Sequence, residues 1–84
     1  MRYERIELSG ERARAVLTPG DGAGTVRIAL RLPGGGGQER TASVADGEER
    51  WATAAWLQQA LSGYRGAGGD VREVALALDL VSGV

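Results

Sequence analysis

The stretch VRIALRL, residues 26–32, decides the fold, because large apolar side chains alternate along it with arginine and alanine. One side of such an extended chain carries four apolar residues: Val26, Ile28, Leu30 and Leu32. This period of two predicts a strand with one buried face and one exposed face. Pro33 and the glycines at 34–37 end the strand, since proline lacks a donor for the ladder and glycine weakens it.

Weaker runs of the same kind lie on both sides of this strand. Ile6 and Leu8 alternate with charged residues, and the run 13–17 alternates likewise before the glycine-rich turn 18–24. Ala42 and Val44 continue the pattern after the four glycines. Four consecutive strands joined by short turns predict an antiparallel meander.

The period changes after the fourth strand. Asp46 and Glu49 have the spacing of a capping box, which predicts the start of a helix. Residues 47–64 are mostly strong helix formers and contain no proline. Five of them fall on one stripe at 100° per residue: Ala54, Leu57, Ala60, Leu61 and Tyr64. Gly63 and Gly66 follow where a C-terminal cap is expected.

The final apolar run returns to a period of two. One face of an extended chain would carry Val74, Leu76, Leu78 and Leu80. The predicted fold is therefore a single α+β domain over residues 1–84, an antiparallel sheet in the order β-β-β-β-α-β with one helix packed on one face.

The composition excludes several kinds of chemistry. The chain has no His, Cys or Lys, so all ten cationic residues are Arg. Disulfides, thiol nucleophiles, imidazole bases, Schiff bases and His or Cys metal sites are excluded. The serines have no activating base, and the paired acids fall on strand ends, a helix start and a loop. We therefore expect no enzyme activity, no catalytic residue, no cofactor and no metal.

The same composition indicates where the protein occurs. Arg without Lys, together with 14 Gly, is typical of a GC-rich bacterial genome. The first residues have no apolar signal region, and the longest apolar run, 74–78, is far shorter than the ~20 residues of a membrane span. We expect a cytoplasmic protein with no membrane contact.

Arginines dominate the outer sheet face predicted by this pattern. The candidates for binding an anion are Arg5, Arg12, Arg14, Arg27 and Arg31. The acids expected on the same face are Glu7, Glu39, Glu73 and Asp79. Cross-strand ion pairing is the alternative to an anion site. A pI of about 5.3 and the presence of only Tyr3 for stacking oppose a nucleic-acid partner.

The net charge of -1 hides an asymmetry between the two halves of the chain. Residues 1–45 hold seven Arg and five acids, whereas residues 46–84 hold three Arg and six acids. The first part therefore carries +2 and the second -3. A dipolar molecule of this kind can orient toward a charged partner or associate head to tail.

The two tryptophans lie on opposite flanks of the predicted helix stripe. Trp56 is expected to close the core edge, and Trp51 to face outward. The candidate interface residues are Trp51, Ala55, Gln58 and Gln59 on the helix, and Ala75 and Ala77 on the last strand. An outward Trp is a common interface anchor, although the loop 33–38 could instead cover it.

These patterns predict a small non-enzymatic protein–protein interaction or regulatory module. We expect it to form a homodimer and to bind an unidentified protein, because a thin core, an edge strand and an outward Trp favour association. The alternative is a binder of an anionic ligand or nucleic acid through the arginine face.

Overall fold

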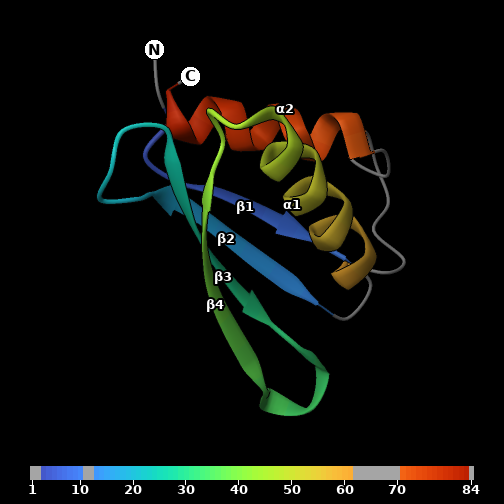
Figure 1. The fold of residues 1–84 in the computed structure, drawn as a ribbon. Helices are drawn as coiled ribbons and strands as arrows, with labels where there is room; N and C mark the ends of the chain where they lie inside the picture. The colour runs from blue at the N-terminus through green and yellow to red at the C-terminus, as the bar shows by residue number, and fades with distance from the viewer. Residues whose placement is uncertain (1–2, 11–12, 62–70, 84) are drawn as a thin grey trace.

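The computed structural model describes residues 3–10, 13–61 and 71–83 of the chain. Its sheet has four antiparallel strands: β1 (Ile6–Ser9), β2 (Arg14–Pro19), β3 (Thr25–Arg31) and β4 (Gly37–Ser43). The strands pair in chain order, β1-β2-β3-β4, as Figure 1 shows. This confirms the predicted meander.

A short 3₁₀ turn, η1 (Pro33–Gly35), connects β3 to β4. Gly34 and Gly35 have φ angles of 84° and 94°, which lie in the left-handed region that favours glycine. The glycine run therefore makes the tight reversal that brings β4 alongside β3.

The alternation in the sequence becomes the two faces of the sheet. Val26, Ile28 and Leu30 of β3 are buried, while Arg27 and Arg31 are exposed. The register places Ile28 beside Leu17 of β2, so apolar side chains from neighbouring strands meet on the same face. The other face is open and carries the arginines.

Helix α1 (Gly47–Ala60) follows β4, and it starts at the predicted cap. The Asp46 Oδ1 atom accepts a hydrogen bond from the Glu49 backbone N–H at 3.1 Å. The capping box is not reciprocal, however, because the Glu49 carboxylate accepts from the Ser43 N–H at 2.6 Å instead. Leu61 caps the helix, and the predicted continuation to Tyr64, with the caps at Gly63 and Gly66, lies outside the described residues.

The prediction of a fifth strand at residues 74–80 is wrong. Residues Val71–Ser82 form a second helix, α2. Ala and Leu favour a helix intrinsically, and the buried residues of this run also fit a helical stripe: Val74, Ala75, Ala77, Leu78, Val81 and Ser82. A period of two and a period of 3.6 both fit this short run of Leu and Ala, so the need to cover the sheet decides between them.

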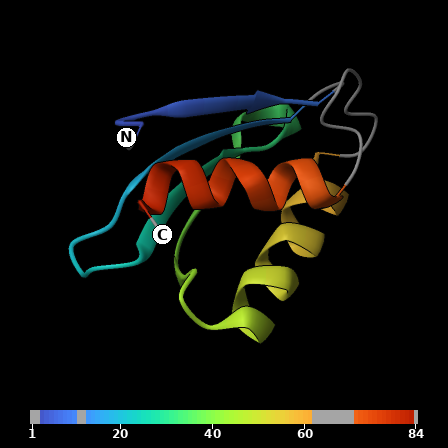
Figure 2. The same ribbon diagram turned by 90° about the horizontal axis from the view of Figure 1, so that it is seen from above.

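Both helices lie on the same side of the sheet, as Figures 1 and 2 show. Helix α2 packs on β2 and β3, and α1 packs on α2 and along β4. The largest fully buried side chains between the layers are Leu17, Val26, Ile28, Leu57, Leu61, Val74, Leu78 and Val81. The α+β class and the one-sided cover are therefore confirmed, with two helices in place of one.

Within residues 3–10, 13–61 and 71–83, neither helix is long and apolar enough to span a membrane.

The backbone N–H of Tyr3 donates to the Leu80 carbonyl at 2.9 Å, which joins the segment before β1 to the end of α2.

Candidate interaction surfaces

The first surface is the open face of the sheet, where four of the five predicted arginines lie exposed. Glu7 of β1 accepts ion pairs from two of them, Arg5 at 3.0 Å and Arg14 at 3.3 Å. Arg27 pairs with Asp21 in the β2–β3 turn at 3.4 Å. Of these three pairs, only Arg14 with Glu7 is a cross-strand pair of the predicted kind. All three are solvent-exposed and weak.

Arg31 differs from its neighbours on this face. The register sets it directly opposite Arg14, so two guanidinium groups share one cross-strand position. Like charges in that arrangement repel each other. Arg31 makes no ion pair within the described part of the chain. Arg12, the fifth candidate, lies outside the described residues.

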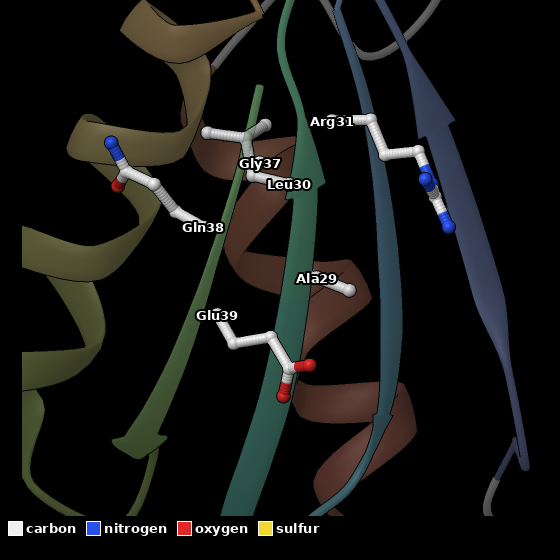
Figure 3. A pocket seen from close by; sticks show the side chains of 6 residues that line it. All are labelled: Ala29, Leu30, Arg31, Gly37, Gln38 and Glu39. Carbon is white, nitrogen blue, oxygen red and sulfur yellow. The ribbon is translucent and has the colours of Figure 1, made fainter. Parts of the chain in front are cut away.

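A shallow depression of about 260 Å³ lies beside Arg31 on β3 and β4. Figure 3 shows the Glu39 side chain reaching across β3, Arg31 pointing away from β4 toward β2 and β1, and Ala29 between them. Gly37, which has no side chain, is the cross-strand neighbour of Arg31. The predicted partners Glu73 and Asp79 are absent from this face because they belong to α2.

The second surface is the outer side of the helices, centred on an ion pair that joins them. The Arg50 guanidinium of α1 binds the Asp79 carboxylate of α2 through two hydrogen bonds, at 2.8 and 2.7 Å. The hydrogen bond with Asp79 raises the pKa of Arg50 above its ordinary value, so the guanidinium stays charged. Arg50 also stacks over the Trp51 ring, 4.9 Å from its centroid.

Two large apolar side chains flank this ion pair. Trp51 is 44% exposed and Leu76, one turn before Asp79 on α2, is 54% exposed. We call Trp51, Ala55, Leu76 and the Arg50–Asp79 pair the helical-layer patch. Its arginine is held at both ends, by a carboxylate and by an aromatic ring, so the patch is structurally ordered before any partner binds.

The predicted interface residues on α1 lie on this outer side. Trp51, Ala55 and Gln59 are exposed, and Gln58 is half-buried. The exposure of Trp51 shows that the loop 33–38 does not cover it. Trp56 is half-buried against the core, as predicted.

The prediction that Ala75 and Ala77 form an exposed stripe is wrong. Both are buried, at 0% and 7% exposure, because residues 71–82 are helical and these two positions face the sheet. Leu76, which the strand pattern assigned to the core, is the exposed residue. Once this run is known to be helical, a spacing of 100° per residue accounts for its exposure.

The third surface is the outer edge of β4. The edge strand expected from the sequence was the last run, which is helical, so the sequence did not indicate this edge. A groove of about 400 Å³ runs between this strand and α1. Its lining residues are Arg40, Thr41, Ala42, Glu49, Ala52, Thr53 and Trp56. The Arg40 guanidinium lies 4.1 Å from the centroid of the Trp56 ring. No sequence motif predicts this pair, because the two residues meet only once α1 folds back along β4.

No protein-family model, curated protein or solved structure matches this chain.

Proposed function

We propose that this chain is a non-enzymatic protein–protein interaction module of the cytoplasm that self-associates through the helical-layer patch. The observation that supports this most directly is the exposure of Trp51, which stacks with Arg50, and of Leu76, one turn before Asp79. Tryptophan and arginine are the residue types most often found at energetic centres of interfaces.

The charge of the helical-layer patch allows it to bind the same patch on a second copy of the chain. A two-fold contact sets the same surface against itself, so a patch with net charge would repel its partner. Here Arg50 is neutralised by Asp79, and the adjoining Arg72 and Glu73 of α2 carry opposite charges. Apolar contact can therefore form without like-charge repulsion.

The proposal assigns no catalytic step to this chain. The sequence has no His, Cys or Lys, which leaves carboxylates and hydroxyls as its possible bases and nucleophiles. The proposed function rests instead on surface recognition by aromatic, apolar and guanidinium groups.

Light scattering coupled to size-exclusion chromatography tests the self-association. We expect the mass to rise from one chain toward two as protein concentration increases, and Leu76→Lys or Trp51→Ala to abolish the rise. Ala45→Lys is the matched control, because it adds the same charge at an exposed site off the patch. A monomer at every concentration would refute self-association.

A second candidate function, anion binding, is favoured by the Arg14–Arg31 position. Arg31, which has no ion pair among the described residues, and Arg14 opposite it can together hold a carboxylate, sulfate or phosphate, which would relieve their repulsion. We expect sulfate to raise the unfolding temperature more than chloride at equal ionic strength. We expect Arg31→Gln to remove this difference between sulfate and chloride. Arg27 lies at another cross-strand position and is already paired with Asp21, so Arg27→Gln should retain the difference.

A further inference from the structure

The free edge of β4 carries unpaired backbone groups. The backbone groups of Thr25 form hydrogen bonds with the β2–β3 turn. Because the direction of backbone groups alternates along a strand, those of Val26, Ile28 and Leu30 point toward β4. The backbone groups of their partners on β4, Ala42, Arg40 and Gln38, point toward β3. The backbone N–H and C=O groups of Thr41 and Glu39 therefore point away from the sheet. Such an edge can accept another strand.

Helix α1 closes one end of this edge. The outward N–H of Ser43 is already bound by the Glu49 carboxylate at 2.6 Å. An added strand can therefore pair with Thr41 and Glu39 but not with Ser43. The available edge matches a short extended segment rather than a long strand.

The groove beside the edge supplies contacts for side chains. In an added strand, alternate side chains would point to the α1 side, over the small Ala52 and the half-buried Trp56. On that side Arg40 stacks on Trp56 and has no carboxylate partner within the described residues, whereas Glu49 is bound to Ser43. The Glu49 carboxylate keeps its negative charge, because a backbone N–H is neutral, but it is directed at Ser43. Arg40 is therefore the cation of the groove that is available to an acidic side chain.

A second copy of β4 fits this edge poorly. One symmetric antiparallel register places Arg40 opposite the Arg40 of the second copy. Another places Glu39 opposite the second Glu39. Both registers bring like charges together across the two-fold axis. The register that pairs Thr41 with itself needs the Ser43 N–H that Glu49 occupies. A segment of different sequence avoids all three conflicts.

We propose that the β4 edge binds an extended segment of a partner protein, which adds an antiparallel fifth strand and sets an acidic side chain against Arg40. Backbone hydrogen bonds to Thr41 and Glu39 supply affinity, and the carboxylate–Arg40 contact supplies selectivity. This site lies apart from the helical-layer patch and operates whether or not the chain self-associates.

The probe is the synthetic peptide acetyl-Thr-Val-Thr-Asp-Thr-Val-Thr-amide, with its Asp placed opposite Arg40 and its first Val opposite Ala42. Amide NMR titration of the whole chain is expected to shift the Glu39 and Thr41 signals most. Replacing the peptide Asp by Asn should weaken binding about tenfold, as expected for loss of a charge-assisted hydrogen bond. A peptide N-methylated at its two Thr residues flanking Asp keeps the charge but should not bind.

Protein variants test the same contacts from the other side. Arg40→Gln should remove the preference for Asp over Asn, and Thr41→Pro should abolish binding by deleting the outward donor. Thr41→Val is the matched control that keeps the donor. If Thr41→Pro fails to fold, the N-methylated peptide makes the same distinction on the unaltered protein.

Two results would overturn the proposal: no shift at Glu39 and Thr41 with the Asp peptide, or equal binding of the N-methylated peptide. The second would show charge attraction without strand pairing. Leu76→Lys, which disrupts only the helical-layer patch, should bind the peptide as the unaltered chain does, so failure of self-association and failure of this site are distinguishable.

Discussion

Single residues hold neighbouring elements together, and the clearest example is the pair formed by Arg50 of α1 and Asp79 of α2. Each side chain is only 24% exposed, and the two hydrogen bonds join residues 29 positions apart in the chain, on different helices. The exposed pair of Arg5 with Glu7, by contrast, joins residues only two positions apart, at the start of β1. These two pairs should contribute very differently to stability.

We expect Arg50→Ala to lower the free energy of unfolding by about 1–2 kcal/mol, because it leaves the half-buried Asp79 carboxylate without its donors. Arg5→Ala should lower it by about 0.5 kcal/mol or less. Urea denaturation followed by circular dichroism measures both. Equal effects would contradict a structural role for the pair between the helices.

Gly10 also acts at the residue scale, because it lets the chain after β1 approach the end of α1. A Cβ atom there would lie 2.8 Å from the Leu61 carbonyl oxygen and 3.0 Å from its Cα. We expect Gly10→Ala to destabilise the protein by about 1–3 kcal/mol, since two backbone segments must separate. Gly47→Ala, where a Cβ meets no atom within 4 Å, is the control and should be neutral in thermal melts.

At the scale of elements, the strands and α1 could be predicted from the sequence and α2 could not. Alternation in 26–32 is strict and bounded by Pro and Gly, and the Asp46 cap marks the start of α1. In 74–80, Ala occupies the positions between the leucines, and Ala fits either face of either element. The choice depends on a tertiary fact, namely that β2 and β3 need cover that α1 alone does not give.

This difference gives a direct test of α2. In a strand, Leu76 and Leu78 would share one buried face, whereas in the helix Leu78 is fully buried and Leu76 is 54% exposed. We therefore expect Leu78→Ala to cost about 2–5 kcal/mol and Leu76→Ala about 0.5 kcal/mol or less. Similar losses for both in chemical denaturation would support the strand instead.

The candidate sites, like the elements, could be predicted from the sequence only in part. Arginines of the open sheet face and the outward Trp51 follow from periodicity, which one strand or helix determines by itself. The Arg50–Asp79 pair, the exposure of Leu76 and the groove by Arg40 and Trp56 require two elements to be placed against each other. Local pattern therefore predicts which side chains are available, and packing determines which of them meet.

At the scale of the whole molecule, the charge asymmetry becomes an asymmetry between layers. The strands come from the half of the chain with charge +2, and both helices come from the half with charge -3. The open sheet face of one molecule can therefore attract the helical layer of another. Such contact competes with the apolar association proposed for the helical-layer patch.

Salt separates these two modes of association. At low ionic strength we expect weak attraction of both kinds, whereas about 0.5 M NaCl should screen the contact between layers and leave the apolar contact intact. Sedimentation velocity at both salt concentrations measures this. At high salt we expect the Leu76→Lys variant to be monomeric and the unaltered chain to stay associated. Complete dissociation of the unaltered chain by salt would contradict the apolar contact.

The order of elements along the chain has a consequence for synthesis. All four strands precede both helices, so the apolar face of the sheet is made first, and its main cover, α2, ends 39 residues after β4. At about 5–20 residues per second, a ribosome needs roughly 2–8 s to supply that cover. Until α2 is made, a sheet formed on the nascent chain lacks the cover that buries Leu17, Val26 and Ile28, which makes this stage of synthesis prone to aggregation.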